Sequence, residues 1–156
     1  MALVIGQSAP DFTLFSTEKK EISLSSYKGK NVVILFFPQS FTGVCTEELC
    51  STRDSIGFYN DQNAEVLAIS VDSVFTLGKF KELNQYNFEL LSDFNKDVSR
   101  LYDCCCEDWI LNMKGVSKRS AFVVDKDGII RYAEVLEKAS EMPDFEALKS
   151  CLRSLD

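Results

Sequence analysis

The chain has 156 residues, of which 46% are hydrophobic and 26% are charged, with a net charge of −7 and no histidine. This composition is typical of one soluble globular domain with its own core. An acidic surface argues against nucleic acid or an anionic membrane as the main partner. Residues 1–7 lack the basic and apolar regions of a signal peptide, and no apolar run reaches membrane-spanning length, so we expect a cytoplasmic protein.

Strand-like and helical patterns alternate along the chain. Residues before position 31 are expected to form an N-terminal hairpin, followed by a strand over 31–37 and a helix over 46–59. A strand over 65–71 and a helix over 75–86 come next, with Leu77, Phe80 and Leu83 expected on one helix face. A strand over 88–91 and a helix over 97–102 complete this alternation.

The last third of the chain predicts a hairpin and one more helix. Strands over 120–124 and 129–135 flank the turn sequence Asp-Lys-Asp-Gly, which is a strong hairpin signature. Pro143 is expected to open the last helix, whose core-facing stripe is Phe145, Leu148, Leu152 and Leu155. The order predicts an α/β domain with a thioredoxin-like fold, in which helices flank a central mixed sheet. We expect a single domain over residues 1–156.

Six cysteines are spread over the chain: Cys45, Cys50, Cys104, Cys105, Cys106 and Cys151. They are too few for a disulfide scaffold, and a chain of this length does not need one. Without histidine or a Cys-x-x-Cys pair, we expect no metal site. Catalysis, redox sensing and simple burial remain as interpretations.

Cys45 is placed where a helix begins. The apolar run 31–37 ends at Pro38, and Thr42 is the predicted N-cap, which puts Cys45 at the third helical position. Free amides and the helix dipole favour a thiolate there, and the thiolate is the reactive form of cysteine. We expect the Thr42 hydroxyl to point into the same space and Pro38 to wall it without adding a donor. The alternative is a buried, inert cysteine.

The spacing Pro38, Thr42, Cys45 resembles the site motif Pro-x-x-x-Thr-x-x-Cys of the peroxiredoxin family, also called the AhpC/TSA superfamily. Residues 8–12, 69–73, 91–94 and 118–125 are similar, in order, to further blocks of that family. The length and residues 41–45 look most like its AhpE-like, one-cysteine group.

The resemblance implies a peroxidase that reduces hydrogen peroxide and organic hydroperoxides without a metal or other cofactor. Cys45 would attack the peroxide and become a sulfenic acid. Thr42 would orient the thiolate and the peroxide. Arg119 would supply charge and donors, and Glu48 would hold Arg119 in place. The alternative for Arg119 is a solvated charge at a strand end.

A resolving cysteine or an external thiol must then reduce the sulfenic acid. Cys50, five residues after Cys45, resembles the second cysteine of the PrxQ branch. Five helical residues separate two Cα atoms by roughly 8–9 Å, so this pair requires local unwinding before a disulfide can form. The triplet Cys104, Cys105, Cys106 departs from the family pattern and is a less favoured resolving candidate, with a subunit link or a passive role as alternatives. We expect burial of Cys151 and interface packing of Trp109.

The expected partners are a thiol reductant, such as thioredoxin or a glutaredoxin/glutathione system, and a second copy of the chain in a homodimer. Two other functions stay open. A peroxide-sensing relay would pass the oxidation to a partner protein. A thiol–disulfide oxidoreductase would require Cys-x-x-Cys, whereas this chain has four residues between Cys45 and Cys50.

Overall fold

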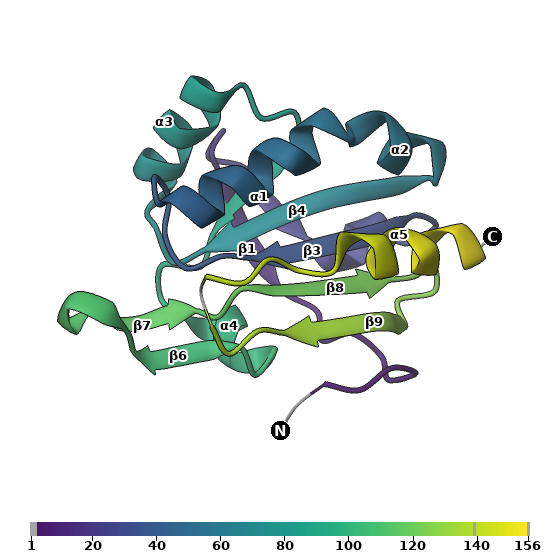
Figure 1. Ribbon diagram of the computed structural model, residues 1–156. Helices are drawn as coiled ribbons and strands as arrows, with labels where there is room; N and C mark the ends of the chain where they lie inside the picture. Colours follow the sequence, from purple (N-terminus) through teal and green to yellow (C-terminus); the bar gives the residue numbers. More distant parts are fainter. Residues whose placement is uncertain (1–2, 139, 156) are drawn as a thin grey trace.

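A computed structural model describes residues 3–138 and 140–155 of the chain. The first two residues of the N-terminal stretch, residue 139 and the last residue of the expected 1–156 domain therefore lie outside the description. Helices lie against a central sheet in a layered α/β arrangement (Figure 1). Among the described residues, no helix is both long and apolar enough to cross a membrane.

The central sheet has seven strands in the order β2-β1-β5-β4-β3-β8-β9. Their bounds are β1 Thr13–Ser16, β2 Glu21–Ser23, β3 Asn31–Phe36, β4 Ala64–Ser70, β5 Glu89–Ser92, β8 Ser120–Val124 and β9 Ile130–Val135. β3 pairs in parallel with β4 and β4 with β5, whereas the remaining pairs are antiparallel. The predicted mixed sheet and N-terminal hairpin are confirmed.

Strand β3 is central, and all six of its residues are buried. Val33 and Leu35 belong to a core with helices α1, α2, α3 and α5, while Ile34 and Phe36 belong to a second core on the opposite face. Burial on both faces explains why this segment reads as a continuous apolar run rather than an alternating one.

The helices differ in detail from the prediction. Their bounds are α1 Gly43–Asp54, α2 Ile56–Asp61, α3 Val74–Asn84, α4 Asp97–Leu101 and α5 Phe145–Ser154, with 3-10 turns at Leu24–Tyr27 and Ile110–Asn112. The single helix predicted over 46–59 is wrong, because it begins earlier and breaks at Ser55. Pro143 does not open the last helix: Asp144 is the N-cap and accepts from the Ala147 amide.

Two further corrections concern the surface. Leu83 is 60% exposed and does not share the buried face of Leu77 and Phe80, because at 3.6 residues per turn it lies about 120° from Leu77 around the axis of α3. A second, two-stranded sheet, β6 Cys105–Asp108 with β7 Lys114–Ser117, was not predicted. It projects beside α4 (Figure 1), and its first strand contains two cysteines of the triplet.

Candidate active site

The loop between β3 and α1 contains Pro38 and Thr42, and the carboxylate of Asp72 anchors this loop. Asp72 Oδ2 accepts from the Ser40 amide and the Ser40 hydroxyl, both at 2.8 Å, and from the Ser70 hydroxyl at 2.7 Å. Because Asp72 follows the neighbouring strand β4, these bonds tie the loop to the sheet.

The same loop contains a residue in an unfavourable conformation. Phe41 has φ of 67°, and its ring centroid lies 4.9 Å from that of Phe80. A non-glycine residue in the left-handed region costs roughly 1–2 kcal/mol, which the surrounding contacts must offset. The loop that precedes α1 therefore has one defined conformation, which its tertiary contacts stabilise.

The predicted N-cap of helix α1 is confirmed, although the helix begins before position 46. Thr42 is the N-cap with extended φ and ψ, and Cys45 is the third residue of the helix and fully buried. The Thr42 hydroxyl donates to the Gln39 carbonyl at 2.9 Å, so its hydrogen is used inside the loop. The structure adds to the expectation that this hydroxyl points into the same space as the thiol: as placed, its oxygen can only accept from another group.

Arg119 joins two buried groups of α1. Its Nη2 donates to Cys45 Sγ at 3.2 Å, and its Nη1 donates to Glu48 Oε1 at 2.7 Å. Arg119 precedes strand β8, which pairs with β3, so the sheet sets its position. The alternative of a solvated charge is wrong, since the Arg119 side chain is 2% exposed and that of Glu48 is 0% exposed.

Burial dominates the electrostatics of Glu48. It raises the pKa of Glu48 from 4.5 to about 7, and the charge of Arg119 offsets only part of that effect. Desolvation acts to lower the pKa of Arg119, but the interactions with Glu48 and Cys45 outweigh desolvation, so the pKa of Arg119 is raised. Among the described residues, Glu48 Oε2 has no hydrogen-bond partner. Arg119 therefore stays cationic beside the Cys45 sulfur.

A small cavity of about 30 Å³ lies against Arg119 and Pro38. This volume has room for about two water molecules, which is also the size of a hydrogen peroxide molecule. Its remaining walls include Trp109, Val116 and Leu136, so most of the lining is apolar. The arrangement offers a small, partly desolvated space next to a fixed positive charge, and the same arginine also contacts the buried Cys45 thiol.

Comparison with known proteins decides the family. The model of the AhpC/TSA family matches residues 5–133. The chain belongs to the AhpC/TSA family. It is 36% identical to alkyl hydroperoxide reductase E of Mycobacterium tuberculosis, with 98% of each chain covered. It is 35% identical to the mitochondrial thioredoxin-dependent peroxide reductase of Bos taurus, with 97% of this chain and 60% of that one covered.

Solved structures agree with this family. Peroxidoxin BcpB of Mycobacterium tuberculosis superposes with a TM-score of 0.86 at 26% identity and 97% coverage of both chains. A peroxiredoxin-like protein of Aquifex aeolicus reaches a TM-score of 0.89 at 23% identity, covering 100% of this chain and 90% of that one, which supports the fold. The chain is a peroxiredoxin with a thioredoxin-like fold, and it is a thiol-dependent peroxidase.

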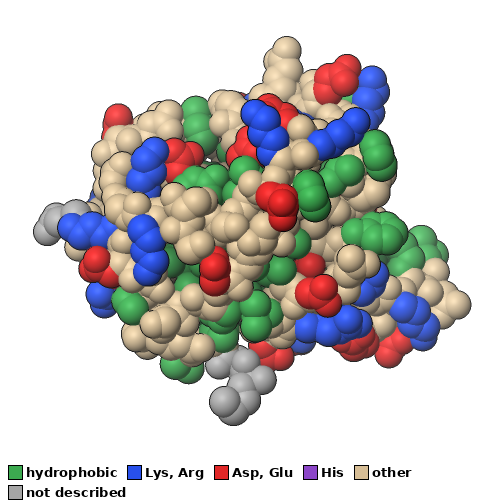
Figure 2. All heavy atoms as spheres, turned by 180° about the vertical axis from the view of Figure 1, so that it is seen from behind, with side chains coloured by type: hydrophobic (Ala, Val, Ile, Leu, Met, Phe, Trp, Pro, Cys, Tyr) green, Lys and Arg blue, Asp and Glu red, His purple; other side chains and the backbone are tan. Residues whose placement is uncertain are grey.

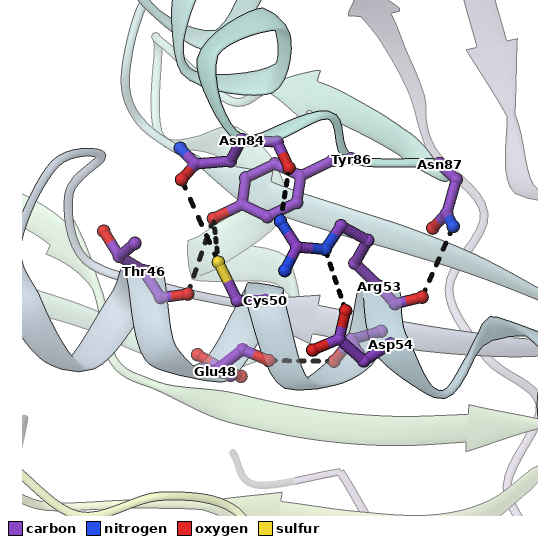
Figure 3. A network of polar contacts seen from close by, with 9 residues as sticks. Thr46, Glu48, Cys50, Arg53, Asp54, Asn84, Tyr86 and Asn87 are labelled. Atoms are coloured by element: carbon purple, nitrogen blue, oxygen red, sulfur yellow. Dashed lines mark hydrogen bonds and ion pairs between the residues drawn. The ribbon is translucent and has the colours of Figure 1, made fainter.

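Cys50 of this peroxiredoxin faces away from Cys45. Its sulfur lies 3.6 Å from the Tyr86 hydroxyl and 3.9 Å from Asn84 Oδ1. Arg53 Nη1 donates to the Asn84 carbonyl at 2.6 Å, so α1 is tied to the end of α3 on this side (Figure 3). Cys45 instead contacts Arg119 at β8. The predicted geometric obstacle to a Cys45–Cys50 disulfide is therefore present in the folded helix.

The remaining cysteines have different environments. Cys104 is fully buried in the second core, while Cys105 and Cys106 in β6 are half-buried. Cys151 is half-buried rather than buried, and its sulfur lies 3.6 Å from the Arg131 carbonyl. Trp109 is half-buried at the cavity.

The pH dependence of stability tests the buried state of Glu48. Between pH 4.5 and about 7, folded Glu48 keeps a proton that the unfolded chain has lost, so its contribution to stability is full below 4.5 and is lost as pH rises to about 7. Relative to Glu48→Gln, the wild type should lose roughly 3 kcal/mol of unfolding free energy across this window. Urea titrations at several pH values measure it. Glu47→Gln, at an exposed neighbour, is the control; a pH-independent difference between wild type and Glu48→Gln would contradict the prediction.

Sequence reasoning missed Asp72 as a positioning residue. Asp72→Ala should lower the rate of Cys45 oxidation about tenfold and the unfolding free energy by about 2 kcal/mol, because Ser40 and Ser70 lose their shared acceptor. Stopped-flow oxidation and urea unfolding measure the two effects. Asp61→Ala, at the exposed end of α2, is the matched control. A wild-type oxidation rate in Asp72→Ala would show that the loop needs no such anchor.

Proposed function

We propose that this peroxiredoxin reduces hydrogen peroxide and organic hydroperoxides at Cys45, with Arg119, Thr42, Glu48 and Pro38 completing the site. The observation that supports this assignment is the contact of 3.2 Å between Arg119 Nη2 and Cys45 Sγ at the start of α1. A fixed guanidinium and the positive end of a helix both stabilise negative charge that develops in the site. The family supports the reaction class.

The reaction is a nucleophilic displacement on oxygen. The Cys45 thiolate attacks one peroxide oxygen, the O–O bond breaks, and the other oxygen leaves with a proton as water or alcohol. Cys45 becomes a sulfenic acid. Arg119 donors stabilise the charge that develops on the two oxygens. Thr42 Oγ1, whose hydrogen is used by Gln39, can accept from the peroxide O–H.

Pro38 and Glu48 act through their neighbours. Pro38 lines the cavity beside Arg119 and has no amide hydrogen to compete for the substrate. Glu48 receives Nη1 of Arg119, which leaves Nη2 directed at the sulfur. These are positioning roles, and the chemistry stays on Cys45.

The second half of the cycle needs two electrons from a thiol reductant. We include in the proposal an external dithiol or thiol of the thioredoxin or glutaredoxin/glutathione class, a cytoplasmic location with a reducing thiol pool, and no metal or organic cofactor.

We also propose that the chain forms a homodimer. Phe15, Phe75 and Phe94 are 51%, 72% and 61% exposed and line a groove of about 580 Å³ between the N-terminal hairpin and α3. Hydrophobic side chains are visible at the surface in the view from behind (Figure 2). A second copy of the chain would remove this apolar area from water.

A peroxide-consumption assay tests the proposed function. The purified protein, given hydrogen peroxide or an alkyl hydroperoxide, should show repeated turnover with thioredoxin and its reductase or with a glutaredoxin/glutathione system. A single stoichiometric oxidation with every reductant would favour the sensor alternative. Reduction of a protein disulfide without any peroxide consumption would favour the oxidoreductase alternative and overturn the proposal.

A further inference from the structure

The cavity beside Arg119 also reaches a cysteine that the peroxidase mechanism does not use. Its lining contains Cys106 together with Pro38 and Arg119, although Cys106 lies on β6, far along the chain from α1. The cavity is small, about 30 Å³, so its walls stand close together. Arg119 touches this cavity and also touches Cys45 Sγ at 3.2 Å. The Arg119 side chain therefore touches both the buried thiol and the cavity that Cys106 lines.

The three consecutive cysteines are distinguishable by environment. Cys104 is fully buried, and burial raises the pKa of its thiol strongly. Burial also raises the pKa of Cys105 to about 11, and a hydrogen bond to Glu107 adds to the effect. Because side chains alternate along a strand, Cys105 and Cys106 point to opposite faces of the β6–β7 sheet. Cys106 alone among the three lines the cavity with Arg119.

The thiol of Cys106 is accessible and lightly held. It is half-buried, and it donates to the Asp108 carbonyl at 3.1 Å within its own strand. Lys118 and Arg119 line the same cavity, and Glu137, also in the lining, pairs with Lys118 at 3.3 Å. A neutral thiol with one weak local bond can turn toward the cavity at little cost.

We infer that Cys106 is the resolving cysteine, which attacks the Cys45 sulfenic acid from the cavity beside Arg119; the inference rests on the proposed peroxidase function. The Cys106 thiol gives up its proton and its sulfur attacks Cys45 Sγ. The S–S bond forms, the S–O bond of the sulfenic acid breaks, and hydroxide leaves with the proton as water. The external dithiol then reduces the disulfide and returns both thiols.

Formation of this disulfide requires a local opening. Two Cα atoms must come within about 7 Å, so the first turn of α1 must unwind and bring Cys45 out past Arg119. This opening must break the contact between Arg119 and Cys45 and release the loop that Asp72 anchors. Reaching Cys50 would disturb more, because Cys50 lies in the third turn of α1 and its neighbours Arg53 and Asn84 tie the helix to α3.

Disulfide mapping of the intact protein tests the inference. The reduced protein receives one equivalent of hydrogen peroxide at low protein concentration, free thiols are blocked, and peptides are mapped by mass spectrometry. We expect a Cys45–Cys106 disulfide within one chain. Cys106→Ser should instead accumulate a Cys45 sulfenic acid that a dimedone trap captures. Cys105→Ser, the neighbour on the opposite face, is the matched control and should form the disulfide at the wild-type level.

Other outcomes would overturn the inference, and they distinguish its failure from a failure of the proposed function. A Cys45–Cys50 disulfide, a disulfide between two chains, or a stable Cys45 sulfenic acid in the wild type would each refute Cys106 while preserving the peroxidase. If Cys45 stayed reduced in the wild type, the proposed function itself would fail. Because the map is read on the wild type, poor folding of a variant cannot obscure the result.

Discussion

Cys45→Ser is expected to lower peroxide consumption by at least about 10³-fold, because a serine hydroxyl at neutral pH is a far weaker nucleophile than a thiolate. The side chain is fully buried, and serine is close to cysteine in size, so the fold should survive. The rate of peroxide loss in stopped-flow measures the effect, and circular dichroism with urea unfolding measures the fold.

The matched control for this substitution is Cys151→Ser, which changes a half-buried thiol on α5 away from Arg119. It should consume peroxide at the wild-type rate. Retention of more than about a tenth of the wild-type rate in Cys45→Ser would contradict the assignment of the reacting sulfur.

Arg119→Met is expected to have the second-largest effect. Loss of the Nη2 donor and its charge should lower the rate of Cys45 oxidation by about 10²–10³-fold, which is the typical cost of removing one donor from a charge-stabilising site. It should also lower the unfolding free energy by about 3 kcal/mol, because Glu48 would remain buried without its ion-pair partner. Stopped-flow oxidation and urea unfolding measure the two quantities separately.

A double variant separates catalysis from stability. Arg119→Met with Glu48→Gln leaves no unpaired charge in the core, so most of the lost stability should return. The oxidation rate should stay low, because Gln cannot replace the guanidinium at Cys45. A double variant that recovered both stability and rate would show that Arg119 has only a structural role.

Much of the fold follows from simple patterns in the chain. The apolar run at 31–37 forms the central strand β3, and the Asp-Gly turn after Asp125 joins β8 to β9. The break at Ser55 and the β6–β7 pair were not predictable in this way. Helix α2, which follows the break, and strands β6 and β7 are all short. Strand β6 contains Cys105 and Cys106 next to charged residues, so it has no alternation of apolar and polar side chains that would reveal a strand.

The candidate active site was also only partly predictable from the sequence. Thr42 as N-cap and Cys45 at the third helical position follow from local spacing. The proximity of Arg119 to Cys45 follows only from family resemblance, because the two residues are distant in sequence and meet through the pairing of β3 with β8. Asp72 and Cys106 were not distinguished in advance, because a tertiary hydrogen bond and a shared cavity leave no mark in sequence spacing.

The most direct test of the account is a sulfenate-trapping map of Cys45→Ser and wild type, each treated with one equivalent of hydrogen peroxide. In the wild type, all of the oxidation should be found at Cys45, as a trapped sulfenic acid or in a disulfide. In Cys45→Ser, the other five cysteines should remain reduced on the same time scale. Oxidation of another cysteine at the wild-type rate, with Cys45 untouched, would contradict the account at its central residue.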